Sequence, residues 1–237
     1  LRTCLEGDKE WARKIANSEV MVGLSSSQAP LDFAAINNQV RAAEMLLNAG
    51  ADPNRTSGWE PPLLHIAAEN DYRDLAILLI ARGAKVEAPY GMHGNKTALH
   101  AAAAANHPEM VNLLIRHGAK VDSRDANGMT PLLRAAEHGW LPVVKVLLDR
   151  GADVHARSSN ADTALHVVER ESWRRVQDGY DVARFLLEKG LDVNARNADG
   201  RTPLDGVNND RTVELLRQHG GKKSRDLPAT PTKVGPA

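Results

Sequence analysis

The chain has 237 residues, of which 42% are hydrophobic, 25% are charged and only 4% are aromatic, a composition typical of folded domains with an aliphatic core. Thirty Lys and Arg residues balance thirty Asp and Glu residues, so the net charge does not favour nucleic acid or an anionic membrane as a partner. The single Cys4 rules out an internal disulfide or a paired-cysteine site, and no apolar run approaches the roughly 18 residues of a membrane helix.

Two sequence landmarks recur in register along the chain and predict a repeat protein. The first is a leucine pair followed by a glycine, and its glycines are spaced by 33, 35, 33, 39 and 30 residues. The second is a short stretch related to Thr-Pro-Leu, as at 130–132, which is predicted to begin the first helix of each repeat. A period near 33 residues indicates stacked supersecondary units. The landmark glycines are Gly50, Gly83, Gly118, Gly151, Gly190 and Gly220.

The fourth repeat indicates the physical role of each landmark. Thr130 is a good helix N-cap and Pro131 fits the first helical position, so a short helix is predicted to begin there. The small Ala135 and Ala136 allow a neighbouring helix to approach closely, while the leucine pair buries a second helix. Gly151 can adopt the left-handed conformation that ends this second helix. Each repeat is therefore predicted to be a helix, a turn, a second helix and a hairpin-like loop.

In chain order, residues 1–28 are predicted to form a degenerate partial N-terminal capping repeat, because residues 5–16 look like the middle of a repeat. The chain starts at Leu1 rather than Met, so we expect a processed or trimmed N-terminus; a cytoplasmic location is slightly favoured, and removal of an export signal stays open. Residues 222–237 are predicted to be a flexible tail, with attachment to an interface as the alternative. Between them, six repeats are predicted at 29–61, 62–96, 97–129, 130–162, 163–201 and 202–221, the last a shortened C-terminal cap.

These motifs resemble the ankyrin repeat over about residues 1–221, most completely at 125–157, DANGMTPLLRAAEHGWLPVVKVLLDRGADVHAR. The resemblance implies an all-α fold, an ankyrin-repeat solenoid of stacked helix-turn-helix units with β-hairpin-like loops. Stacking should stabilise the fold, because one repeat cannot bury its apolar face alone. Some positions depart from the family pattern and are expected to weaken local capping: Ala98 and Ala164 replace its proline, and Asp32, Leu133 and Asp205 replace its histidine.

Nine histidines raise the question of a metal or catalytic site. His93, His100 and His107 are evenly spaced, but they fall in a hairpin, a helix and a turn, so we expect no metal site. His65, His100 and His166 occupy the histidine slot of the repeat, where the resemblance implies hydrogen bonds that brace helix and hairpin. Phosphate-loop and nucleophile-elbow motifs are missing from the sequence. We therefore expect a protein that is not an enzyme and uses no cofactor.

The resemblance implies recognition of a protein partner through the concave surface formed by the hairpins and the first helices. The expected role is that of a scaffold, adaptor, inhibitor or accessory subunit, either monomeric or within a hetero-complex, without nucleic acid and without membrane insertion. The alternative is that the chain is the regulatory ankyrin arm of a longer multidomain enzyme or channel.

Aromatic and arginine side chains on this surface are the favoured anchors, because they dominate interface energetics. Trp59, in a hairpin, is the first choice, with packing on the adjacent hairpin as the alternative. The hairpin before the third repeat is two residues longer than its siblings and carries Tyr90, Met92 and His93. The other contact positions carried over from the family are Glu69, Asn70, Met129, Glu137, His138 and Arg170.

The fifth repeat contains an insertion of six residues: 25 residues separate Leu165 from Gly190, whereas the four preceding repeats have 19 at this place. The apolar spacing of Leu165, Val168 and Val176 favours an extension of the first helix by more than a turn. A longer helix would project past its neighbours as a second contact site, with packing of its tryptophan over the extra turn as the alternative. The residues predicted for this site are Trp173, Arg174, Arg175 and Tyr180.

Overall fold

The structure is a computed structural model that describes residues 30–56, 61–91, 95–168 and 178–228. The chain divides into two compact units, residues 1–120 and residues 121–237. The described residues form twelve α-helices and no strand, with one isolated antiparallel bridge between Tyr90 and Lys96. The fold is therefore all-α, as the sequence predicts. None of these helices is both long enough and apolar enough to cross a membrane.

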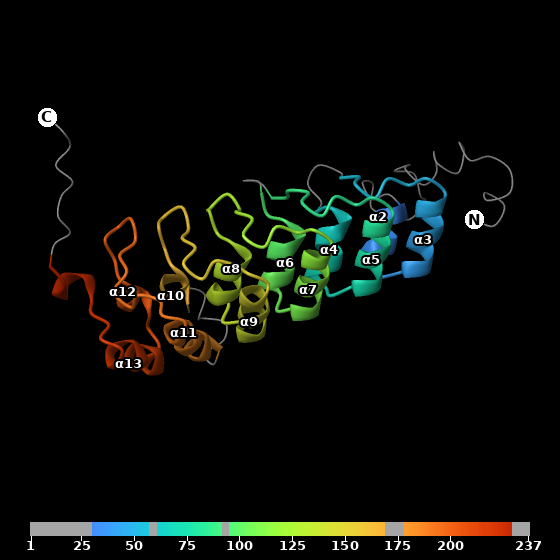
Figure 1. The fold of residues 1–237 in the computed structure, drawn as a ribbon. Helices are drawn as coiled ribbons and strands as arrows, with labels where there is room; N and C mark the ends of the chain where they lie inside the picture. The colour runs from blue at the N-terminus through green and yellow to red at the C-terminus, as the bar shows by residue number, and fades with distance from the viewer. Residues whose placement is uncertain (1–29, 57–60, 92–94, 169–177, 229–237) are drawn as a thin grey trace, which may run out of the picture. The chain divides into compact units, whose positions relative to one another are not determined.

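The described part of unit 1 consists of three helix pairs that stack in chain order (Figure 1). Within each pair the two helices contact each other. The first helices are also in contact, α2 with α4 and α4 with α6. The loops that follow the second helices lie together on one side of the pairs (Figure 1). The pairs are α2 (Pro30–Ile36) with α3 (Val40–Asn48), α4 (Leu63–Glu69) with α5 (Arg73–Ala81), and α6 (Ala98–Ala104) with α7 (Pro108–Arg116).

The described part of unit 2 contains three further helix pairs and a short terminal turn. The helix α8 contacts α10, which contacts α12, and α11 contacts both α9 and α13. The pairs are α8 (Pro131–Glu137) with α9 (Leu141–Asp149), α10 (Ala164–Val167) with α11 (Asp178–Glu188), and α12 (Pro203–Gly206) with α13 (Asp210–Gln218), followed by the 3-10 turn η2 (Ser224–Asp226).

The core of each unit is built from alanines and leucines of the first helices together with aliphatic residues of the second. Ala135 and Ala136 have no exposed surface, and neither has Leu147. Small side chains let the helices approach closely, while the leucines supply most of the buried apolar area. The predicted caps are confirmed: the Thr130 hydroxyl accepts a hydrogen bond from the Leu133 N–H at 3.3 Å, and Gly151 has a φ of +88°.

The predicted extension of the first helix in the fifth repeat is wrong. The helix α10 ends at Val167, and Val168 has φ −52° and ψ 127°, outside the helical region. Val167 and Val168 are both buried, so the apolar pattern reflects burial of a chain that leaves the helix. The contact residues predicted on this extension at 173–175 lie outside the described residues, as does Arg170.

The tail prediction is wrong for residues 222–228, which are held by the last repeat. The Lys222 N–H donates to the Asn194 side chain at 2.8 Å, and the Lys222 carbonyl accepts from the Thr202 hydroxyl at 2.8 Å. The Ser224 N–H donates to the Asp205 carboxylate at 2.9 Å. These bonds satisfy polar groups at the end of the repeat stack. Residues 1–28, the predicted N-terminal cap, and residues 229–237 lie outside the described residues.

Candidate functional site

Adjacent hairpins of unit 2 are joined by main-chain hydrogen bonds. The Ser159 N–H donates to the Asn127 carbonyl at 2.9 Å, and the Ala198 N–H donates to the Asn160 carbonyl at 2.8 Å. The hairpins approach so closely that a Cβ on Gly128, whose φ is +67°, would lie 2.6 Å from the Ser159 nitrogen. The hairpin backbone in unit 2 is therefore a connected row whose outer side chains are held at fixed spacing.

Three arginines at equivalent positions reinforce this row, and we call Arg124, Arg157 and Arg196 the arginine ladder. Arg124 donates to the Gly128 carbonyl in its own hairpin and to the Arg157 carbonyl in the next. Arg157 donates in the same way to the Ala161 carbonyl at 3.1 Å and to the Arg196 carbonyl at 3.0 Å. A guanidinium suits this task because its donors form a fixed planar fork.

The last arginine of the ladder binds the C-terminal segment in place of a further hairpin. Arg196 donates to the Gly200 carbonyl at 2.9 Å, to the Ser224 carbonyl at 3.2 Å and to the Pro228 carbonyl at 3.0 Å. The segment at 222–228 therefore occupies the acceptor position that the next repeat would provide. This is a second reason why that segment does not behave as a free tail.

In unit 1 the hairpin before α6 is held by a buried histidine of α4. The His65 ring lies 5.8 Å from the Tyr90 ring in an edge-to-face arrangement, and its Nε2 lies 2.9 Å from the Lys96 carbonyl. The pKa of His65 is lowered, mainly by burial of the ring and further by the nearby His100. The hydrogen bond to the Lys96 carbonyl acts in the opposite direction but is outweighed. His65 is therefore neutral near pH 7 and braces helix and hairpin, as the resemblance implies.

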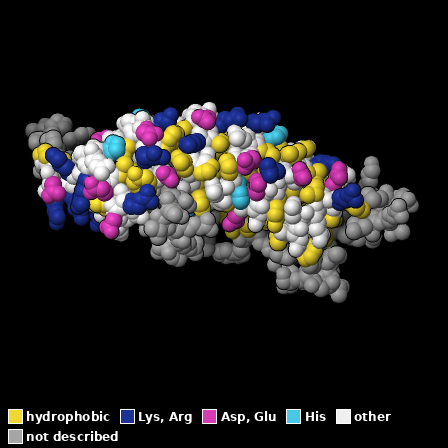
Figure 2. Space-filling view, turned by 90° about the horizontal axis from the view of Figure 1, so that it is seen from below, with side chains coloured by type: hydrophobic (Ala, Val, Ile, Leu, Met, Phe, Trp, Pro, Cys, Tyr) yellow, Lys and Arg dark blue, Asp and Glu magenta, His cyan; other side chains and the backbone are white. Residues whose placement is uncertain are grey.

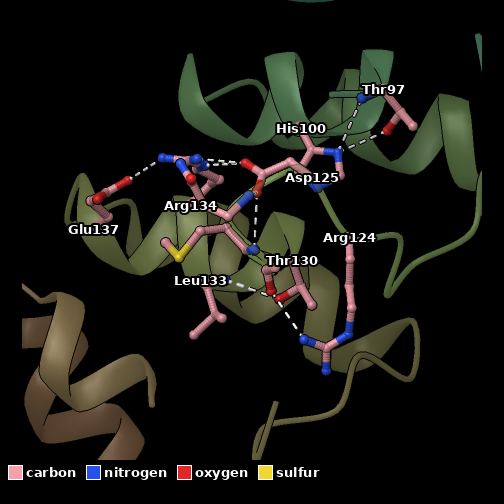
Figure 3. A network of polar contacts seen from close by, with 11 residues as sticks. Thr97, His100, Arg124, Asp125, Thr130, Leu133, Arg134 and Glu137 are labelled. Carbon is pink, nitrogen blue, oxygen red and sulfur yellow. Dashed lines mark hydrogen bonds and ion pairs between the residues drawn. The ribbon is translucent and has the colours of Figure 1, made fainter. Parts of the chain in front are cut away.

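Polar groups also connect a hairpin of unit 2 to its first helix (Figure 3). Arg134 of α8 donates to the Asp125 carboxylate through Nε at 3.0 Å and through Nη2 at 2.5 Å, and to Glu137 at 2.8 Å. Asp125 also accepts from the N–H groups of Met129 and Asn127, at 3.0 Å and 2.9 Å. Both carboxylates are buried, so the network fixes the hairpin on α8.

The electrostatics of this network favour the charged forms. Burial by itself would raise the pKa of Asp125, but the hydrogen bonds and charge of Arg134 and the two backbone N–H groups outweigh it, so the pKa lies below the ordinary value. Burial by itself would lower the pKa of Arg134, but Asp125 and Glu137 together raise it. The arrangement is a satisfied structural network, and its groups are occupied by one another.

The helix caps show how the histidine slot tolerates substitution. In α6 the Thr97 N–H donates to Nδ1 of His100 at 3.2 Å (Figure 3), and Thr163 and His166 repeat this contact at 3.2 Å. In α12, where Asp205 replaces the histidine, the Thr202 N–H donates to the Asp205 carboxylate at 2.9 Å instead. The cap at Asp205 is therefore kept, with a carboxylate in the acceptor role.

The predicted contact residues fall into different environments. Glu69 and Asn70 are exposed at the end of α4, and His138 is half-buried after α8. Tyr90 packs on His65, and the Arg211 guanidinium lies 4.6 Å from the centre of the Tyr180 ring, which joins α11 to α13. The predicted contacts in two hairpins, at Trp59, Met92 and His93, lie outside the described residues.

Two predicted contact residues are contradicted by their burial. Met129 is 3% exposed, and its N–H binds Asp125, so the side chain belongs to the interior. Glu137 is 7% exposed and is paired with Arg134. Both residues were predicted at the surface from their positions in the repeat, whereas in the structure neighbouring residues cover them.

The arginine ladder and the Asp125 network were not recognised from the sequence. A signal for the ladder was present, because an arginine follows Gly118, Gly151 and Gly190 at the same distance of six residues. Among the described residues, no group of three His, Cys, Asp or Glu side chains is placed to hold a metal ion. On the face shown in Figure 2, Lys and Arg side chains are interspersed with Asp and Glu.

Comparison with family models agrees with this architecture. One model, described as ankyrin repeats in three copies, matches residues 64–158. A second, described as ankyrin repeats in many copies, matches residues 31–80 and 172–205. A comparison with curated proteins found no match. With its stacked helix pairs, its hairpin row and these matches, the chain belongs to the ankyrin repeat family.

Proposed function

We propose that this chain is a non-enzymatic scaffold, adaptor, inhibitor or accessory subunit that binds a protein partner along its hairpins and first helices. Ankyrin repeats are generally protein–protein interaction modules, and the fold is typically non-catalytic.

The observation that carries the proposal is the connected hairpin row of unit 2. Main-chain hydrogen bonds from Ser159 to Asn127 and from Ala198 to Asn160 hold the hairpins at fixed spacing. A surface that is ordered before binding loses less conformational entropy when a partner docks, so more of the contact energy contributes to affinity. Exposed polar side chains beside such a row can form a polar rim around a few anchors.

The test is capture of a partner by the purified chain, compared with a Trp59→Ala, Met92→Ala double variant. We expect the wild-type chain to retain a specific partner and the double variant to lose it, because truncation of an aromatic anchor commonly costs 2 kcal/mol or more, roughly a thirtyfold loss in affinity. Ile77→Ala is the matched control, since Ile77 is a 46% exposed apolar residue on the second helix α5.

Two outcomes would contradict the proposal. Equal recovery of the same partner by the wild-type chain and the double variant would exclude the hairpin anchors. Loss of the partner in Ile77→Ala alone would place the contact surface on the second helices instead.

A further inference from the structure

The hairpins of unit 1 differ from those of unit 2 at the position of the arginine ladder. Each ladder arginine lies six residues after a helix-ending glycine, and in unit 1 the same position holds Thr56 after Gly50 and Pro89 after Gly83. Neither side chain carries a guanidinium that could reach the next hairpin. At these two positions unit 1 therefore has no arginine to bridge neighbouring hairpins as Arg124 and Arg157 do in unit 2.

A groove of about 200 Å³ lies between two hairpins of unit 1, and both Thr56 and Pro89 line it. Pro53, Ala84 and Ala88 form much of the remaining wall, which is largely apolar. The groove is smaller than the roughly 300–1,000 Å³ typical of small-molecule pockets, so its size suits a single side chain.

The side chain of Asn54, which lines the groove, connects the two hairpins that form it. The Asn54 amide nitrogen donates to the Gly83 carbonyl at 2.9 Å, and the Asn54 amide oxygen accepts from the Lys85 N–H at 2.7 Å. Because the Asn54 side chain ties its own hairpin to the backbone at Gly83 and Lys85, the groove is formed before any ligand arrives. A preformed groove lowers the entropic cost of binding.

Pro89, which lines the groove, is also the counterpart of an acceptor residue of the ladder. In unit 2, Arg124 donates to the carbonyl of the next ladder residue, Arg157, and the counterpart of that carbonyl in unit 1 belongs to Pro89. Among the described residues, no backbone N–H donates to the Pro89 carbonyl. An arginine side chain combines an apolar stem, which suits proline and alanine walls, with donors for such a carbonyl.

We propose that this groove is the docking site for an arginine side chain of the protein partner. The stem lies against Pro53, Ala84 and Ala88, and the guanidinium donates to the Pro89 carbonyl. This inference rests on the proposed function, and it adds the chemistry of one anchor: the partner carries an exposed arginine that takes the place that Arg124 and Arg157 take within unit 2.

The charge of Lys85 beside the groove provides a test of the occupant's charge. Lys85 is exposed at the rim and its ammonium would repel an arginine weakly, because exposed charges are screened by water and salt. Removal of this charge in Lys85→Gln should strengthen binding of an arginine ligand by about twofold, whereas it should weaken binding of an acidic ligand. The sign of the change therefore distinguishes the two kinds of occupant.

The direct experiment titrates the whole chain with the peptide acetyl-Gly-Arg-Gly-amide and follows methyl resonances by NMR. We expect shifts at Ala84, Ala88 and Leu64, which line the groove, and a tighter fit in Lys85→Gln. Peptides with Lys, Leu or Glu at the central position are the controls. Equal or larger shifts with any control peptide, no shift with the arginine peptide, or weaker binding in Lys85→Gln would overturn the proposal.

A second variant is designed to occupy the groove with a side chain of the protein itself. Thr56→Arg places an arginine at the ladder position, and we expect it to abolish the peptide shifts and to raise the unfolding temperature by about 2–4 °C. Thr56→Lys, which has a charge but no planar fork, should raise it less. An unchanged unfolding temperature together with undiminished peptide binding in Thr56→Arg would overturn the assignment.

Failure of this inference and failure of the proposed function give different results. If the arginine peptide does not bind but the Trp59→Ala, Met92→Ala variant still loses a captured partner, the groove assignment fails and the protein-binding function stands. If the peptide binds as expected but those hairpin substitutions leave partner capture unchanged, the groove assignment stands and the proposed anchors fail.

Discussion

Three histidines occupy equivalent positions in their repeats, but the hydrogen bonding of their Nδ1 atoms differs. Nδ1 of His100 and of His166 faces the N–H of a threonine three residues earlier. The corresponding residue before His65 is Pro62, which has neither an N–H nor a hydroxyl, and Nδ1 of His65 is buried without a partner. A buried acceptor without a donor costs roughly 1–3 kcal/mol, so the unpaired Nδ1 of His65 lowers the free energy of unfolding.

Pro62→Thr is expected to stabilise the chain by about 1 kcal/mol. The new N–H and hydroxyl supply partners for Nδ1 of His65, and this gain exceeds the roughly 0.4–1 kcal/mol lost when proline no longer restricts the unfolded chain. The measurement is the midpoint of urea unfolding. Pro62→Ala supplies the N–H without the hydroxyl and should lie between the two; a threonine variant less stable than wild type would contradict the account.

The burial of His65 also predicts how stability depends on pH. Its pKa in the folded chain is lowered below the ordinary value of 6.5. Above pH 6.5 neither state of the chain binds a proton at this ring; below it the unfolded chain binds one while the folded chain does not, so stability falls as pH falls. The loss from this group cannot exceed about 1.4 kcal/mol per pH unit.

Urea unfolding at pH 7.5 and pH 5.5 tests this prediction. We expect the wild-type chain to lose more stability between these values than His65→Gln, whose side chain does not titrate. The same loss in both proteins would assign the pH dependence to other groups.

At the scale of the elements, hairpins and first helices are joined by buried charges and by close backbone approach. Arg134 of α8 holds Asp125 of the preceding hairpin, and the side chain of Asp125 is only 2% exposed. Gly128 in the same hairpin meets the backbone of the next one. The orientation of this hairpin is therefore determined by tertiary contacts on both of its sides.

Arg134→Met is expected to destabilise the chain by roughly 3–5 kcal/mol. Methionine keeps the apolar stem but leaves Asp125 and Glu137 buried without a compensating charge. Chemical unfolding measures the loss, and the triple replacement with Asp125→Asn and Glu137→Gln should recover part of it because no unpaired charge remains. A loss below 1 kcal/mol in the single variant would show that the network contributes little.

Gly128→Ala is expected to cost more than 2 kcal/mol and to cost more than Gly151→Ala. Both glycines have positive φ, which costs alanine roughly 1–2 kcal/mol, but only Gly128 has backbone within contact distance of an added Cβ; nothing lies within 4 Å at Gly151. Thermal unfolding of the two variants isolates the contact between hairpins. Equal losses would argue against a close approach at Asn127 and Ser159.

At the scale of the whole molecule, the last repeat is closed by the chain's own C-terminal segment. Burial by itself would raise the pKa of Asp205, but hydrogen bonds from Thr202 and Ser224 outweigh it and lower the pKa. Arg196, the last arginine of the ladder, donates to the Gly200 carbonyl of its own hairpin and to the Ser224 and Pro228 carbonyls of the C-terminal segment. Repeat stacks need such closure because a terminal repeat lacks one neighbour.

Removal of residues 222–237 is expected to lower the stability of the chain by about 2 kcal/mol, because Asn194, Thr202 and Asp205 lose hydrogen-bond partners. Removal of residues 229–237 alone is the matched control and should leave the unfolding midpoint unchanged. Equal midpoints for both truncations would show that the segment at 222–228 does not support the last repeat.

The sequence by itself determined the repeat period, the all-α class and the helix caps. These features depend on residues close together in the chain, such as Thr130 with Leu133 or the glycine after each leucine pair, so a local pattern is enough. The tertiary structure decided the burial of Met129 and Glu137, the end of α10 at Val167, the attachment of residues 222–228 and the groove beside Pro89. Each of these depends on partners supplied by another segment or a neighbouring repeat, and burial and hydrogen bonding between separated segments leave no period in the sequence.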